Sequence, residues 1–266
     1  MQRGSAKSTS AQHCADGLYL LFDDQHRPDR AAMLAALSAM PDTSVSHDPS
    51  LGDHGTAASR LDPLRRGDWL ELLKWGMTFD CLGLAPGPGV AFPPIEYRFN
   101  CPVDQEAQGT QSIALVAGPH LADAANSLPI VRAMLEIGAE LVDRLEGIVA
   151  VGWGPARSAI APAFFSRSVH AWIAGGPFPA LGMVGFASGD DGALRTDGLG
   201  WFIGQELELT PALAGDRVAA TRLAARLIHE LVSSGAVDQP SEADLGGGLR
   251  VRLDPFNETV VRVSVE

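Results

Sequence analysis

The segment 113–154 reads IALVAGPHLADAANSLPIVRAMLEIGAELVDRLEGIVAVGWG. It begins with an apolar run, 113–117, that stops at Gly118, which is the length and boundary of a strand buried on both faces. A second run, 148–152, has the same character. Parallel strands need a long crossover connection, so the segment predicts a strand, a crossover helix and a parallel strand with a right-handed connection.

The residues between the two runs have the periodicity of one long helix. Ser127 can accept a hydrogen bond from a free amide of the first turn, and Pro129 lies where a missing N–H costs nothing. Gly147 is placed to end the helix. Apolar residues recur at helical spacing at Val131, Met134, Leu135, Gly138, Leu141, Val142 and Leu145. We expect residues 120–146 to contain a central helix that connects two parts of the chain.

The composition is that of a globular, acidic protein. Of its 266 residues 46% are hydrophobic, which is enough to bury a substantial core in one large domain or two small ones. The formal net charge is −12, and Lys7 and Lys74 are the only lysines. Neutralising phosphates needs a clustered basic face, so nucleic acid is not expected as a partner.

The N-terminal and cysteine patterns favour the reducing cytoplasm. Residues 1–16 are expected to be a disordered tail, because they lack the apolar run of a secretory signal. No stretch of the chain approaches the roughly 20 apolar residues that cross a bilayer, so no membrane partner is expected. The cysteines form no C-x-x-C pair and suggest neither a disulfide framework nor a zinc site; they are Cys14, Cys81 and Cys101.

Before the central segment, the pattern predicts a strand at 18–22, a helix at 29–40 and a short helix at 103–108. Residues 42–68 are rich in Ser, Asp, Gly and Pro, which predicts a long loop. Residues 70–84 alternate as a tight hairpin, in which Lys74 and Asp80 are expected to face water.

After the central segment, we expect a helix at 157–172, a strand at 181–187, a turn at 189–192, and strands at 203–209, 249–253 and 259–265. The clearest helix is 216–234, which Gly235 ends. Its buried stripe is expected to consist of Val218, Leu223, Leu227, Ile228, Leu231 and Val232.

The order of these elements favours an α+β fold. Residues 17–119 and 147–266 can each be arranged as strand, helix, strand, strand, helix, strand, which is the ferredoxin-like βαββαβ order. The sequence therefore predicts two tandem ferredoxin-like halves joined by a central helix in 120–146. One larger mixed α/β sheet is the alternative.

A second signal follows the predicted turn, in the series Arg195, Thr196, Asp197, Gly198, Leu199, Phe202, Gly204, Glu206 and Glu208. Before it come a hairpin, a proline-rich stretch, an apolar strand, a leucine-rich helix and the segment 150–154. The order resembles that of an uncharacterised bacterial family, catalogued as domain of unknown function 4261, over residues 70–237. This chain departs from the family in carrying Ile203 between Phe202 and Gly204 and no aromatic residue at Gly152. The resemblance implies a fold and carries no activity.

Seven residues are candidates for a binding surface. Glu206 and Glu208 lie two apart on a predicted strand, the spacing of a carboxylate pair that could bind a metal or move a proton, although the wet face of any strand gives the same pattern. Trp153 and Trp201 end predicted strands, where ligands gather in such sheets, although core packing is the simpler explanation. The remaining candidates are Arg195, Thr196 and Asp197.

The histidines form no recognisable catalytic or metal-binding motif. His229 and Glu230 begin like a zinc-protease helix, but Ser233 stands where the second histidine belongs, and His229 is expected to face water. Metal-capable side chains in the predicted loop are His47, Asp48, Asp53 and His54, a set that surface loops gather by chance. We expect neither a metal nor a cofactor.

These observations favour a non-catalytic protein that binds another protein, as a monomer or homodimer. It would be an accessory or immunity-like factor in a bacterial competition or secretion locus, because the chain is acidic and shows no reactive constellation. The alternative is a small-molecule hydrolase or metal-dependent enzyme that uses carboxylates near Glu206 and Glu208.

Overall fold

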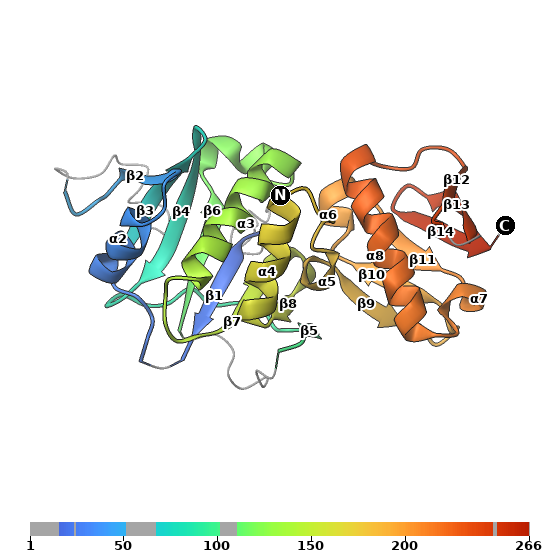
Figure 1. Ribbon diagram of the computed structural model, residues 1–266, viewed down its shortest axis with the longest axis horizontal. Coiled ribbons are helices and arrows are strands. Elements are labelled where there is room, and N and C mark those ends of the chain that lie inside the picture. The colour runs from blue at the N-terminus through green and yellow to red at the C-terminus, as the bar shows by residue number, and fades with distance from the viewer. Residues whose placement is uncertain (1–15, 24, 52–67, 102–110, 247–248, 266) are drawn as a thin grey trace, which may run out of the picture.

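Two β-sheets lie side by side and divide the chain into two lobes (Figure 1). The structure is a computed structural model that describes residues 16–23, 25–51, 68–101, 111–246 and 249–265. In these residues the first lobe carries an eight-stranded sheet and the second a six-stranded sheet. The predicted tail 1–16 (except Asp16), most of the predicted loop 42–68 and the short helix 103–108 lie outside the described residues.

The eight-stranded sheet has the order β2-β3-β4-β6-β1-β7-β8-β5. Its neighbouring strands are antiparallel except β5 and β8, which are parallel. The strands are β1 (Leu18–Phe22), β2 (Thr43–His47), β3 (Asp68–Lys74), β4 (Met77–Leu84), β5 (Tyr97–Phe99), β6 (Ser112–Ala117), β7 (Ile148–Trp153) and β8 (Ser158–Ile160). The hairpin predicted at 70–84 is confirmed as β3 and β4, whereas β2 forms within the predicted loop.

The predicted crossover is confirmed, but another strand, β1, lies between its two parallel strands in the sheet. β1 is antiparallel to both β6 and β7, so β6 and β7 run parallel to each other, and α3 (Leu128–Val142) connects them. Pro129 lies in the first turn as predicted, but the side chain of Ser127 makes no capping hydrogen bond. All five residues of β1 are buried, so its backbone groups need partners on both edges.

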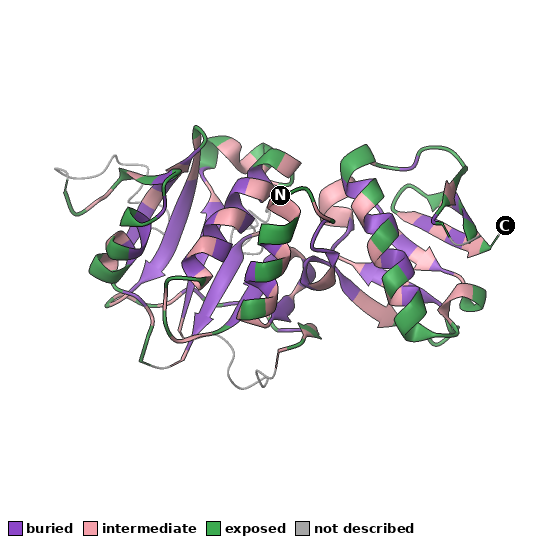
Figure 2. Cartoon of the chain, in the orientation of Figure 1, coloured by how far each residue is buried: buried purple, intermediate pink, exposed green. Residues whose placement is uncertain are grey.

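Three helices, α2 (Arg30–Ser38), α3 and α4 (Pro162–Ile173), cover one face of this sheet (Figure 1). Gly138 lets α3 approach the sheet closely, because a Cβ there would lie 2.2 Å from Cδ2 of Leu18. On the opposite face, Phe92 belongs to a second apolar cluster and packs over Gly152, where a Cβ would lie 2.5 Å from its ring. Buried residues thus fill the sheet and the helix sides that face it (Figure 2).

The six-stranded sheet has the order β12-β13-β14-β11-β10-β9, and of its described pairs only β11 and β14 are parallel. Its strands are β9 (Gly185–Ser188), β10 (Leu194–Asp197), β11 (Glu206–Leu209), β12 (Ser241–Asp244), β13 (Arg250–Asn257) and β14 (Val260–Val265). The long helix α8 (Arg217–Ser234) packs on this sheet and confirms the helix predicted at 216–234. Val218 is 59% exposed, so its assignment to the buried stripe was wrong.

Short helical turns connect these elements: η3 (Pro119–Ala124), η4 (Gly154–Ala156), α5 (Ala180–Met183), α6 (Gly200–Ile203) and α7 (Pro211–Ala214). No helix in the described part of the chain is long and apolar enough to cross a membrane.

The division of the chain differs from the predicted one. The βαββαβ order occurs once, as β1, α2, β4, β6, α3 and β7, with β2 and β3 inserted before β4 and β5 inserted before β6. Since β7 pairs with β1 and β8 with β7, the boundary expected at residue 147 falls after residue 160. In the second lobe α8 follows three strands and precedes three, so two tandem ferredoxin-like halves are not confirmed. The eight-stranded sheet agrees in part with the predicted alternative.

Two polar side chains that were expected to face water are buried. Lys74 is fully buried at the end of β3, and Asp80 on β4 is 3% exposed. Lys74 lies on the same face of β3 as Leu72, beneath α3. Glu136 and Glu140 of α3 supply the opposite charge, at 3.6 and 3.3 Å from the lysine Nζ.

Candidate functional site

Aromatic side chains join the two lobes. Trp153 is fully buried at the end of β7, and its ring centroid lies 5.1 Å from that of half-buried Trp201 in α6. Phe202 stacks on Trp153 at 6.0 Å and meets Phe178 edge-on at 5.2 Å. Trp172 of α4 lies 5.3 Å from Phe178. The two candidate tryptophans therefore lie within the packing between the lobes.

Glu206 on β11 is the acceptor for the turn before α6. Its carboxylate accepts hydrogen bonds from the backbone amides of Gly198 at 2.9 Å, Leu199 at 3.2 Å and Gly200 at 2.8 Å. The hydroxyl of Thr196 also donates to it, at 2.6 Å. An acidic group is favourable at the start of a helix, and here four donors occupy its two oxygens.

Glu208, two residues further along β11, bridges two arginines. Its Oε2 accepts from Nε of Arg195 and its Oε1 from Nε of Arg262, both at 2.9 Å. Arg195 also binds Asp191 in the β9–β10 turn, and this hydrogen bond lowers the pKa of Asp191 to about 2. Glu206 and Glu208 share a face of the strand, but each carboxylate is held by its own set of donors.

Asp197 links the second lobe to the first. Its carboxylate accepts from the hydroxyl of Tyr97 on β5 at 3.1 Å and from Arg157 at 3.0 Å. Arg157 also pairs with Glu96 at 2.6 Å. Burial, and then the charge of Asp197, raises the pKa of Tyr97 to about 12. The charged and hydroxyl-bearing candidates thus bond to other groups of the protein.

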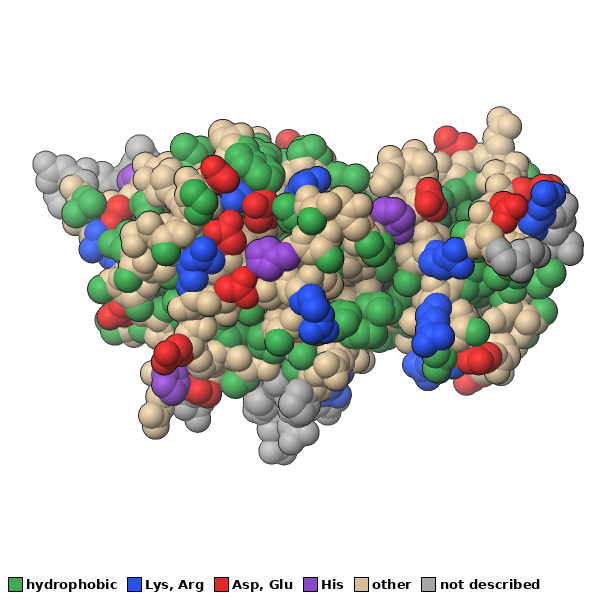
Figure 3. Space-filling view, viewed as in Figure 1, with side chains coloured by type: hydrophobic (Ala, Val, Ile, Leu, Met, Phe, Trp, Pro, Cys, Tyr) green, Lys and Arg blue, Asp and Glu red, His purple; other side chains and the backbone are tan. Residues whose placement is uncertain are grey.

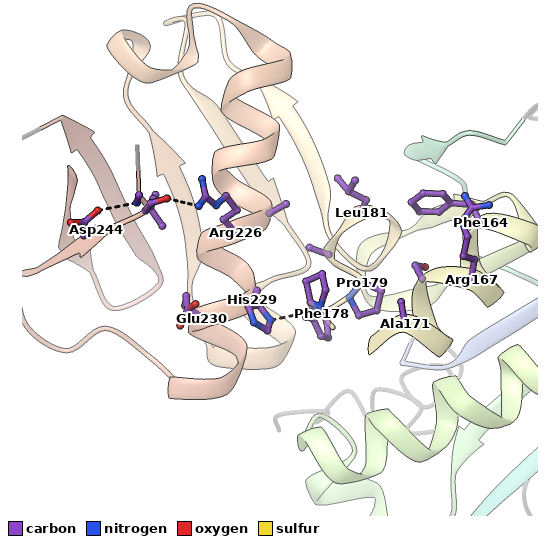
Figure 4. A pocket seen from close by; sticks show the side chains of 16 residues that line it. Phe164, Arg167, Ala171, Phe178, Pro179, Leu181, Arg226, His229, Glu230 and Asp244 are labelled. Carbon is purple, nitrogen blue, oxygen red and sulfur yellow. Dashed lines mark hydrogen bonds between the residues drawn. The ribbon is translucent and has the colours of Figure 1, made fainter. Parts of the chain in front are cut away.

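A groove opens between the lobes where α4 faces α8 (Figure 4). It has a volume of about 940 Å³, and its walls are mainly apolar. A second hollow of about 640 Å³ continues it along α8 and shares residues with it, and we call the two together the interlobe groove. The apolar side chains that line the groove include Phe164, Ala171, Phe178, Pro179, Leu181 and Ala225.

Four exposed arginines border the interlobe groove: Arg167 on α4, and Arg217, Arg222 and Arg226 on α8. Figure 3 shows basic side chains on this face on both sides of the hollow between the lobes. Among the described residues, none of the four forms an ion pair with a carboxylate; Arg226 donates instead to the carbonyl oxygen of Leu245, and Arg217 to that of Phe186 at 3.5 Å. Seven other described arginines do pair with carboxylates: Arg30, Arg144, Arg157, Arg195, Arg250, Arg252 and Arg262.

The other polar groups of the groove include His229 and Glu230 of α8 and Asp244 of β12. Nδ1 of His229 accepts the backbone N–H of Phe178 at 3.1 Å (Figure 4), so His229 does not simply face water as predicted. Glu230 is exposed beside it. The groove is therefore basic along the first part of α8, and it carries two acidic groups, Glu230 near the end of α8 and Asp244 on β12.

Only part of this site can be recognised from the sequence. The arginines of α8 can be placed on the predicted helix 216–234, on the side away from its apolar stripe. Arg167 and Phe164 come from a different predicted helix, 157–172. No local pattern indicates that these two helices border one groove, because that depends on how the lobes pack.

No group of three or more His, Cys, Asp or Glu side chains among the described residues could hold a metal ion. Of the loop residues considered from the sequence, Asp48 pairs with Arg30, and the ring of His47 lies 5.5 Å from that of Trp69. Asp53 and His54 lie outside the described residues.

Comparisons with protein-family models, with curated proteins and with solved structures found no match to this chain. The family resemblance over residues 70–237 therefore stays a prediction.

Proposed function

We propose that this protein is a non-catalytic binding protein that holds an apolar segment of a partner protein in the interlobe groove. The observation that carries the proposal is the groove itself, about 940 Å³ with mainly apolar walls and a continuation of about 640 Å³ along α8. A groove between helices is a recurring way to hold a peptide segment by its apolar side chains. An accessory or immunity-like factor acts in this manner: it binds a segment of its partner and catalyses no reaction.

The hydrogen bonds of Glu206 and Glu208, the two carboxylates of the alternative enzyme hypothesis, favour a binding function over a catalytic one. Glu206 accepts four hydrogen bonds from its own turn and strand, and Glu208 is bound by Arg195 and Arg262. A general acid, a general base or a metal ligand needs an oxygen that can reach substrate or metal. Neither glutamate lines the interlobe groove.

The proposal is tested by filling the groove. Random linear peptides displayed on phage are selected against the full chain, and the dissociation constants of the enriched peptides are measured. Ala171→Trp places a large ring in the groove from an exposed position of α4, so it should weaken binding by about tenfold or more. The matched control, Ala35→Trp, lies at an exposed position of α2 outside the groove and should leave binding unchanged. Peptides that bind both variants equally would place the contact elsewhere and refute the proposal.

A further inference from the structure

We infer that the segment held in the interlobe groove is an acidic, amphipathic peptide, whose carboxylates pair with the arginines of α8 and whose apolar side chains pack against Phe164, Phe178 and Leu181. This inference rests on the proposed function and names the chemistry of the partner. The walls of the groove carry four arginines against two carboxylates, Glu230 and Asp244, so their charge is opposite in sign to that of the chain as a whole.

Most of the described arginines outside the groove pair with a carboxylate, whereas those of the groove do not. The chain carries a formal net charge of −12, so carboxylates are plentiful, and seven described arginines elsewhere have one as a partner. Arg167, Arg217, Arg222 and Arg226 border one groove, and none has a carboxylate partner among the described residues. A ligand that brings its own carboxylates complements this arrangement.

The positions on α8 are unfavourable without a ligand. Arg217 begins the helix, where the partial positive charge of the helix end disfavours a cation. Arg222 and Arg226 are four residues apart on one helix face, where like charges repel, and of the two only Arg226 has an acidic residue, Glu230, four positions further on. Both effects are small, but a bound carboxylate reverses the sign of each. Breaking such local rules is expected at functional sites.

The apolar side chains that line the groove indicate that the peptide carries apolar residues as well as acidic ones. Phe164 projects from α4, while Phe178 and Leu181 come from the segment between the lobes (Figure 4). Val218, an apolar residue 59% exposed on α8, lies beside the arginines in the continuation of the groove. A peptide that carried acidic residues alone would leave these surfaces in water.

The groove also gives the peptide a direction. The arginines follow the first part of α8, and Glu230 lies near its end. The acidic end of the peptide should therefore lie near Arg222, and its neutral or basic end near Glu230. Arg222 and Arg226 are separated by a rise of about 6 Å, which carboxylates two apart on an extended peptide or four apart on a helical one can match.

The inference is tested with the peptides enriched by display. They should be rich in Asp, Glu and large apolar residues, and the best peptide should lose about tenfold or more in affinity when its acids are changed to Asn and Gln. The double variant Arg222→Glu with Arg226→Glu, in the full chain, should lose at least as much. Its control is Arg252→Glu, a reversal at an exposed β13 position outside the groove, which should bind as the natural chain does. Circular dichroism checks that each variant is folded.

The possible failures are distinguishable. Peptides whose binding Ala171→Trp abolishes, but which are neutral or basic and indifferent to Arg222→Glu with Arg226→Glu, would refute the acidic partner and leave the proposed function standing. Absence of any peptide sensitive to Ala171→Trp would refute the proposed function itself. Dodecanoate binding that depends on Arg222 and Arg226, with no peptide bound, would assign the groove to a lipid-like anion and overturn both.

Discussion

Phe178 donates its backbone N–H to Nδ1 of His229, at 3.1 Å, and so ties the segment between the lobes to α8. Because Nδ1 is the acceptor, a neutral ring carries its proton on Nε2. Both residues line the interlobe groove, and the ring of Phe178 also packs on Trp172 of the first lobe. This hydrogen bond therefore helps to fix the positions of the two walls of the groove relative to each other.

His229→Ala should destabilise the fold, because the amide of Phe178 loses its acceptor at a largely buried position. The expected decrease in the free energy of unfolding is about 1–3 kcal/mol, measured by urea denaturation. His229→Asn is the matched control, since its Oδ1 occupies a place similar to Nδ1 and can accept the same bond. Equal losses in the two variants would mean that ring packing, and not the hydrogen bond, is what matters.

Glu206→Ala should be more damaging than a change at a solvated glutamate. It leaves the amides of Gly198, Leu199 and Gly200 without their acceptor at the start of α6. We expect a loss of about 2–4 kcal/mol in the free energy of unfolding, because partly buried donors go unpaired. Glu242→Ala, at an exposed position of β12, should change stability by less than about 0.5 kcal/mol. Similar values for the two would show that the turn does not depend on the carboxylate.

Lys74→Met should be strongly destabilising. The lysine is fully buried between Glu136 and Glu140, and one buried oxygen of each glutamate has no described hydrogen-bond partner. Removing the cation leaves Glu136 without a cationic partner among the described residues and Glu140 with only Arg144, at 3.7 Å, at an expected cost of about 3–5 kcal/mol. Adding Glu136→Gln and Glu140→Gln removes the uncompensated charge and should recover most of the loss. A triple variant no more stable than Lys74→Met would contradict this account.

Asp143 should make stability depend on pH in the acid range. Burial acts to raise its pKa, but hydrogen bonds from Ser166 and His170 outweigh burial and hold the pKa below 3.8. A lowered folded pKa contributes stability above the unfolded value, and that contribution is lost as pH falls through the folded value.

The measurement is the free energy of unfolding at a series of pH values on both sides of 3.8. Asp143→Asn should flatten the curve in this range, and Ser166→Ala should flatten it in part, because the pKa then moves back toward its ordinary value. Ser168→Ala is the control, since that hydroxyl binds only the carbonyl oxygen of Phe165. An unchanged curve in Asp143→Asn would assign the acid transition to other carboxylates.

Prediction succeeded where the signal is local. The crossover in 113–154 followed from apolar runs and helical spacing, and the hairpin at 70–84 from alternation around a turn. The same alternation puts Lys74 on the face of Leu72, yet the lysine was expected in water, because its partners Glu136 and Glu140 lie on a helix more than sixty residues away. Charge alone could not reveal that pairing.

In the candidate site, too, local features could be recognised from the sequence and long-range ones could not. The series from Arg195 to Glu208 was predicted to contribute binding residues, and in the structure its members bond to one another and to the first lobe. The groove was not anticipated, because its walls combine α4 with α8, and each helix taken alone shows an ordinary amphipathic pattern.

The sequence by itself determined the acidic charge, most of the helices and strands, and the apolar faces that each of them buries, because these depend on residue type and on spacing within one element. The tertiary structure decided that β7 and β8 join the first sheet, that the tryptophans pack between the lobes, and that unpaired arginines meet apolar side chains in one groove. Those outcomes come from contacts between residues far apart in the chain, which no local period encodes.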